Sequence, residues 1–242
     1  MVLQPNRAPW NTQGFWHYKG GMAPKTERRY SHGDESRRRI LEATAQIAAE
    51  RGYEGTSISL VSKRSGLPAS SIYWHFADKD ELIATVIEES FARWLATLPA
   101  WSPPRQGEDL LVHCREVWRE SSAALLANQD FLRLGLLLTL ERRPSEPRGR
   151  VRFLECRKLT LQRLAEWFAA CLDWAGAPPS DDTARRLAAT QMALADGLFI
   201  GLQTSEDDQV AGELWDFAFS LLASVIRDAR SANGNHLDAS LE

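Results

Sequence analysis

The residues best suited to binding chemistry lie within the segment 56–82. Three small residues, Ala69, Ser70 and Ser71, would let the backbone approach the edges of DNA bases, which serine hydroxyls and an alanine methyl can contact. The aromatic side chains that follow have polar tips on apolar bodies, which suits them to hydrogen bonding with phosphate. They are Tyr73, Trp74 and His75. Together these residue types predict contact with both the backbone and the bases of DNA.

A further candidate for phosphate binding is Lys79, at the expected start of a longer helix. Asp78, with Glu81 three residues later, resembles a capping box that opens this helix. The Lys79 ammonium and the free backbone amides of the helix N-terminus would together favour a phosphate. Each residue alone also has a plainer interpretation. The aromatic residues could belong to the core, and His75 could be only a favourable residue at a helix C-terminus.

Two short helices must position these side chains. Thr56 is expected to cap a helix that ends at Gly66, and a second helix runs from about Pro68 to Trp74. A longer helix opens at Asp78 and continues through Trp94. Two short helices joined by a glycine-containing turn form a helix-turn-helix, whose second helix can enter the major groove.

The rest of the chain also has helical periodicity, and no strand-like alternation of useful length is present. The first 35 residues contain several Pro and Gly without an apolar pattern and are expected to form a disordered basic arm. We therefore predict an all-α protein with an arm over 1–35, a helix-turn-helix domain over 36–96 and a larger helical domain over 97–242.

The net charge of −3 hides an asymmetry along the chain. Residues 1–96 hold 13 basic and 11 acidic side chains, whereas residues 97–242 hold 16 and 21. Residues 1–40 alone carry eight basic and three acidic side chains. A basic arm indicates a polyanionic partner, although a solvated tail with an accidental charge bias explains it equally well.

The composition argues against several other classes of protein. The longest apolar stretch, Leu134 to Leu140, is far shorter than the ~20 residues that span a bilayer, and no apolar run near the N-terminus suggests a secretory signal. Three cysteines without metal-ligand spacing indicate reduced thiols. No glycine-rich phosphate loop, nucleophile elbow or His-Glu metal motif is present. We expect a cytoplasmic protein that is no enzyme and has no cofactor, metal site or membrane partner.

Three segments strongly resemble the TetR (tetracycline-repressor) family of bacterial transcriptional regulators. They are R-R-R-I-L-E-A-T-A-Q-I-A-A-E-R-G-Y (37–53), T-S-I-S-L-V-S-K-R-S-G-L (56–67) and S-I-Y-W-H-F-A-D-K-D-E-L (71–82). The resemblance implies a homodimer that binds a palindromic operator, commonly as a repressor, and a C-terminal domain that binds a small-molecule effector. When bound to its operator, such a protein would be associated with the nucleoid.

The resemblance also implies roles for individual residues. Thr56 and Ser57 would contact phosphate, and Ala69, Ser70 and Ser71 would face bases. The residues that would grip the DNA backbone are Tyr73, Trp74, His75 and Lys79. Many family members have Ser-Lys-Gly where this chain has Pro68-Ala69-Ser70, so that a lysine is missing here. An alternative is therefore a TetR-like effector-binding or interaction dimer that has lost sequence-specific DNA binding.

A stripe of small residues at four-residue spacing predicts a close helix contact in the C-terminal half. The stripe is Ala189, Ala193, Gly197 and Gly201. By analogy with the family we assign it to the dimer interface, although it could instead pack inside one subunit. The apolar residues expected opposite it are Leu214, Phe217, Leu221 and Val225.

An effector pocket would need aromatic side chains and a few polar groups between helices. The candidates are Trp118, Phe131, Trp167, Gln191 and Phe199. Aromatic residues at helical spacing usually form plain core, so this alternative stays open for most of them. Asp196 could be a polar group of the pocket or a hydrogen-bonding residue of the interface.

Overall fold

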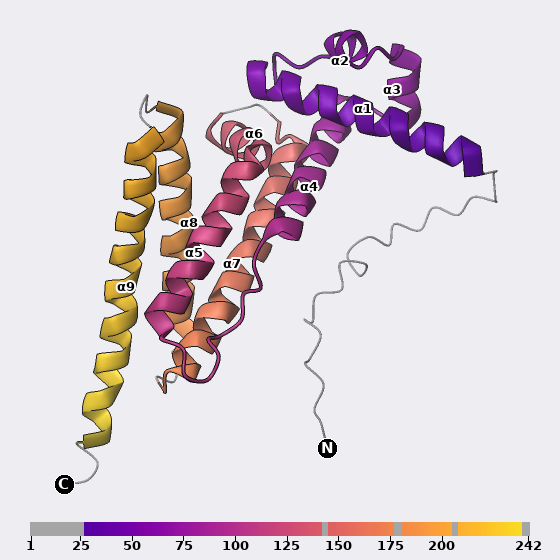
Figure 1. Ribbon diagram of the computed structural model, residues 1–242. Helices are drawn as coiled ribbons and strands as arrows, with labels where there is room; N and C mark the ends of the chain where they lie inside the picture. The colour runs from indigo at the N-terminus through magenta and orange to yellow at the C-terminus, as the bar shows by residue number, and fades with distance from the viewer. Residues whose placement is uncertain (1–26, 142–144, 177–180, 205–207, 239–242) are drawn as a thin grey trace.

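The computed structural model describes residues 27–141, 145–176, 181–204 and 208–238, and these residues form helices and no strand (Figure 1). The helices are α1 (Glu27–Arg51), α2 (Ile58–Ser65), α3 (Ala69–His75), α4 (Lys79–Thr97), α5 (Leu110–Ala127), α6 (Gln129–Leu140), α7 (Arg148–Trp174), α8 (Asp181–Thr204) and α9 (Asp208–Asp238). The predicted all-α fold is confirmed.

Helices α1 to α3 lie together at one end of the molecule (Figure 1). Their shared core consists of apolar residues that are essentially unexposed, among them Ile40, Ala48, Val61 and Ile72. Gly52 and Gly66 follow α1 and α2 with φ of 68° and 67°, a left-handed conformation that favours glycine. These two glycines let three helices turn tightly around one small core.

Helix α1 begins earlier than expected. Residues 27–35, predicted as part of the disordered arm, are helical here, while residues 1–26 of that arm lie outside the described residues. The prolines that argued against helix all precede residue 27, and a single glycine, Gly33, is tolerated within a long helix.

Helix α4 connects the first three helices to the rest of the molecule (Figure 1). Half of the expected capping box at its start is present: Asp78 Oδ1 accepts from the Glu81 amide at 2.7 Å. Glu81 Oε2 instead accepts from the Ala77 amide at 2.7 Å, one residue before the N-cap. From there α4 packs along α7 and buries one face, which ends at Trp94. One continuous helix therefore connects the capped start of α4 to the buried Trp94 near its other end.

The remaining helices form a bundle in which α8 packs against both α7 and α9. Two clusters of buried apolar residues fill the molecule. The first joins α1–α4 to the end of α5, to α6, to the first half of α7 and to Phe199 of α8, and the second joins α5, the later part of α7, α8 and α9. No single described helix is long and apolar enough to cross a bilayer. Helices α5 and α6 meet the criteria of length and apolar composition only when they are counted as one segment, and they are bent by 77° relative to each other.

Candidate nucleic-acid interface and ligand cavity

Helix α3 turns one face inward and displays the other. Ile72 is completely buried and fixes the helix on the core, whereas Tyr73 is 57% and Trp74 76% exposed. Ser70 is also exposed, and Ala69 and Ser71 are half-buried. Large exposed aromatic residues are unusual on a monomer surface. The face that carries Ser70, Tyr73 and Trp74 is therefore free to contact a partner.

His75 stands at the C-terminal end of α3, with its ring edge-on to that of Trp74 at a centroid distance of 4.5 Å. Partial burial lowers the pKa of His75 below its usual value, and the nearby Arg37 lowers it further, while Asp34 opposes the shift. Because the pKa falls below 6.5, the imidazole is largely neutral at pH 7. Its expected phosphate contact would therefore be made by a neutral ring N–H.

Thr56 and Ser57, both predicted to contact phosphate, differ in burial and in their hydrogen bonds. Thr56 is 1% exposed and its hydroxyl donates to the Gly52 carbonyl at 2.7 Å. Ser57 is exposed, and its hydroxyl caps α2 by accepting from the Leu60 amide at 3.3 Å. The prediction that Thr56 caps this helix is wrong. Its buried hydroxyl already has a partner, which leaves Ser57 as the phosphate candidate at this position.

Lys79 contacts the loop between α1 and α2. Its Nζ donates to the Tyr53 carbonyl at 3.2 Å, lies 4.1 Å from the Tyr53 ring centroid and is 3.9 Å from Glu54 Oε2. The Tyr53 hydroxyl in turn donates to Asp80 Oδ1 at 3.2 Å. Sequence reasoning missed this arrangement, since it treated Lys79 only as a phosphate ligand. The sequence signal available for this contact was Tyr53, an aromatic residue just after the first helix.

Asp80 also links the start of α4 to α7. Both of its carboxylate oxygens accept from the Arg148 amide, at 3.1 and 3.0 Å, at the beginning of α7. The Arg148 guanidinium lies 3.6 Å from Asp78 Oδ2. The sequence offered no signal for this contact, because the two residues are far apart in the chain. It ties the N-terminal end of α4 to the bundle.

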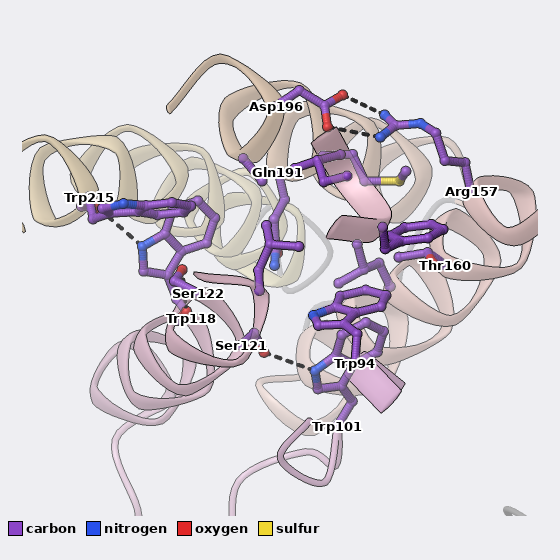
Figure 2. A pocket seen from close by; sticks show the side chains of 16 residues that line it. Trp94, Trp101, Trp118, Ser121, Ser122, Arg157, Thr160, Gln191, Asp196 and Trp215 are labelled. Carbon is purple, nitrogen blue, oxygen red and sulfur yellow. Dashed lines mark hydrogen bonds and ion pairs between the residues drawn. The ribbon is translucent and has the colours of Figure 1, made fainter. Parts of the chain in front are cut away.

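A cavity of about 70 Å³ lies within the bundle (Figure 2). It is enclosed by side chains of α4 to α9 together with Trp101 from the α4–α5 connection. Of the predicted pocket residues, three line it: Trp118, Phe131 and Gln191. The other two do not. Trp167 is 3% exposed and its indole N–H donates to the Ser102 carbonyl at 2.9 Å, and Phe199 is 2% exposed within the first cluster. Both are core residues.

The cavity lining is aromatic with few polar groups. Arg157 and Asp196 form a two-pronged ion pair at its edge, with N–O distances of 2.8 and 2.6 Å (Figure 2). This places Asp196 at the cavity, which answers the question that the sequence left open. The Trp101 indole N–H donates to Ser121 Oγ at 3.1 Å. The site can thus enclose an apolar molecule but holds most of its polar groups in internal contacts.

The residues predicted for a dimer interface lie on the outer side of α8 and α9. Leu214, Phe217, Leu221 and Val225 are 44–64% exposed. Ala189, Ala193 and Gly197 of the small-residue stripe are exposed and Gly201 is half-buried. A Cβ atom at either glycine would meet nothing within 4 Å among the described residues. The alternative in which this stripe packs inside one subunit therefore does not fit the described part of the chain.

Comparison with known proteins points to the N-terminal domain. Residues 40–86 match the family described as "Bacterial regulatory proteins, tetR family". The chain is 33% identical over 69 residues to the HTH-type transcriptional regulator AcrR of Shigella flexneri, covering 28% of this chain and 31% of that protein. It is 35% identical over 63 residues to the HTH-type transcriptional repressor AcnR of Corynebacterium efficiens, covering 26% and 34%. The match spans about a third of each of these relatives.

The whole fold is similar to that of a solved complex. AibR in complex with isovaleryl coenzyme A and operator DNA superposes with a TM-score of 0.57 at 16% identity, covering 77% of this chain and 97% of that one. At this identity the likeness establishes the fold alone. It extends the similarity from the N-terminal domain to the helical bundle.

Proposed function

Because its helix-turn-helix domain belongs to the TetR family of bacterial regulatory proteins, we propose that this protein is a ligand-responsive transcriptional repressor that binds a palindromic operator as a homodimer. The observation that carries the proposal is the outward face of α3, where Tyr73 and Trp74 are exposed while Ile72 anchors the helix. A short helix held on a rigid core with its outer face free can enter a major groove.

Within this proposal, some residues of α3 contact bases and others contact phosphate groups. Ser70, Ser71 and Ala69 read base edges, because small side chains let the helix backbone come close to the groove floor. Contacts to phosphate come from the flanking side chains. These are Ser57, Tyr73, Trp74, His75 and Lys79. Helix α3 itself carries no lysine or arginine, so attraction to the DNA backbone depends on its surroundings, such as the exposed Lys63 of α2.

The homodimer is supported by the exposed apolar face of α9 and the open small-residue stripe of α8. Phe217 alone leaves 64% of its area in solvent, and a contiguous apolar face of this kind marks an interaction surface. Small residues at four-residue spacing would allow a helix of the second copy to approach closely. Two copies joined there would present two α3 helices to half-sites about 34 Å apart.

The response to a ligand is assigned to the cavity, since Trp94 of α4 forms part of its wall. The same helix begins at Lys79 and Asp80, which hold the α1–α2 loop and the start of α7. A ligand that prefers one position of α4 shifts the orientation of the DNA-binding domains. AibR, a protein with a similar fold, has been solved with both isovaleryl coenzyme A and operator DNA, which supports such a pairing of sites.

The test is fluorescence anisotropy of the full chain with DNA from upstream of its own gene, against a scrambled duplex, at two salt concentrations. Selective binding to a two-fold symmetric site that weakens steeply with salt supports the proposal. Equal binding to operator candidates and scramble would contradict it. That result would favour the alternative, a TetR-like dimer that has lost sequence-specific DNA binding. The alternative is motivated by the lysine that is missing before Ser70.

A further inference from the structure

Two hydrogen-bond donors at the cavity lack an acceptor. The indole N–H groups of Trp94 and Trp215 have no hydrogen-bond partner in the described part of the chain, although the two side chains are only 7% and 8% exposed. Trp101 and Trp118 line the same cavity with their N–H groups engaged, 3.1 Å from Ser121 Oγ and 3.1 Å from the Trp215 carbonyl. Buried donors without a partner are rare, because leaving them unpaired costs free energy.

The donor of Trp94 is held in place. Its ring stacks on that of Phe131, with centroids 6.1 Å apart and an interplanar angle of 8°, and it also contacts Phe91 at 5.6 Å. In Figure 2 the indole nitrogen of Trp94 faces the space into which Gln191 also extends. Turning the donor away would break the stack. An acceptor that enters the cavity would thus meet a preorganised N–H group.

Among the described residues, the charged side chains that line the cavity are already paired. They are Arg157 and Asp196, which neutralise each other through two hydrogen bonds of 2.8 and 2.6 Å. An ionised ligand would therefore be buried without a counter-ion, which is strongly unfavourable. The remaining lining is mainly aromatic and aliphatic and favours an apolar molecule.

We propose that the cavity binds an uncharged, largely apolar molecule that carries an acceptor oxygen, such as a carbonyl, which accepts a hydrogen bond from Trp94 Nε1. The inference rests on the proposed function, because it names the chemical class of the effector for the cavity assigned there. The cavity measures about 70 Å³, below the ~150 Å³ cavity known to admit benzene. Acyclic molecules of two or three carbon atoms are therefore the appropriate probes.

The experiment follows the nine tryptophan indole signals of the full chain by ¹H–¹⁵N NMR. The probes are acetone, propane without an acceptor, and acetate with a charge. Acetone is expected to shift the Trp94 indole proton downfield and to bind more tightly than either of the other two. The Trp94 signal is assigned from its absence in Trp94→Phe.

Trp94→Phe keeps an aromatic ring and removes the donor. Relative to propane binding, it should weaken acetone binding roughly fivefold to tenfold, the usual range for one buried hydrogen bond. The space that the smaller ring leaves affects both probes, so the comparison isolates the donor. Trp101→Phe is the matched control, since it lines the same cavity but its N–H is already engaged. It should leave the preference for the ketone intact.

Three results would overturn the proposal: equal binding of propane and acetone, preferred binding of acetate, or an unchanged preference in Trp94→Phe. The titration contains no DNA, so its failure is separate from failure of the proposed function. A ketone-selective Trp94 response in a protein that ignores its operator would keep the ligand class and remove the regulatory role. Selective DNA binding without any response of Trp94 would do the reverse.

Discussion

Lys79 and Tyr53 form a double contact between the start of α4 and the loop that joins α1 to α2. The Lys79 ammonium donates to the Tyr53 carbonyl at 3.2 Å and lies 4.1 Å from the centre of its ring. A cation over an aromatic face adds roughly 0.5–1 kcal/mol at a partly exposed site. The first residue of α4 is therefore attached to the loop that leads into α2, so α4 and the helix-turn-helix are connected at two points of the chain.

Replacing Lys79 with Met tests both roles of this residue. We expect weaker binding to operator and scrambled DNA alike, and a salt slope reduced by about one, because one phosphate contact is lost. Anisotropy titrations at several salt concentrations measure both quantities. Lys63→Met, which removes an exposed lysine from α2, serves as the charge-matched comparison. A lower melting temperature with an unchanged salt slope would show that Lys79 acts only through Tyr53.

Replacing Ser70 with Ala should change sequence preference rather than general affinity. A lost base contact costs about 1–3 kcal/mol at one base pair, so the ratio of operator to scrambled binding should fall about tenfold. Binding to operators with single base-pair changes measures this effect. Tyr73→Phe is the contrasting variant, expected to weaken all sequences equally. A uniform loss in Ser70→Ala would assign that serine to the DNA backbone.

The lowered pKa of His75 predicts a pH dependence of DNA binding. In the protein without DNA, burial and Arg37 lower the pKa of His75, so its imidazole is largely neutral at pH 7. In the complex, a phosphate group beside the ring would favour the protonated form. Binding then takes up a proton, so affinity should rise as the pH falls through and below 6.5. His75→Gln should remove this part of the pH profile. Identical profiles for both proteins would place His75 outside the phosphate contacts.

The proposed homodimer through α9 predicts the effect of a charge on the apolar face of that helix. Phe217→Asp puts a charge on the centre of that face, and we expect the dimer to dissociate at least tenfold more readily because the charge would be buried at the interface. Analytical ultracentrifugation measures this change. Val112→Asp substitutes another exposed apolar residue, on α5, where 57% of the side chain lies in solvent. Equal effects of both substitutions would argue against a dimer through α9.

Gly135 of α6 predicts a stability effect that involves no ligand. A Cβ atom at this position would lie 2.1 Å from the Phe153 ring, which is completely buried and has no room to move. Gly135→Ala should therefore destabilise the protein by about 1–3 kcal/mol despite the better helix propensity of alanine. Urea unfolding measures the change. Gly197→Ala, where a Cβ meets nothing within 4 Å, should not destabilise the isolated subunit.

The sequence predicted the features that depend on local pattern. Gly66, the capping residues Asp78 and Glu81, and the periodicity of α4 are local signals, and the structure has these elements where they were expected. Thr56 was misassigned because two adjacent hydroxyl residues can both cap a helix, and the choice depends on which of them the core buries. The start of α1 was also missed, since a polar first turn has no apolar face to reveal it.

The contacts that position the site could not be predicted, since they join distant parts of the chain. Asp80 and Arg148 are 68 residues apart, and nothing in either local sequence marks the other as its partner. For the same reason Trp167 and Phe199 could not be told apart from Trp118 and Phe131: all four are aromatic residues on helices, and only the packing of several helices decides which of them border a cavity.

The first apolar cluster does not stop where the chain passes from the helix-turn-helix into the bundle. It runs from Ile40 through Ile72 and α4 to Phe131 and Phe153 without interruption. Helices α1 to α3 therefore cannot swing freely about a solvated linker. Any change in their orientation must exchange one interlocked set of side chains for another, so the protein should occupy a few discrete orientations separated by barriers. A ligand would then shift the population between these discrete orientations and would not change the orientation gradually.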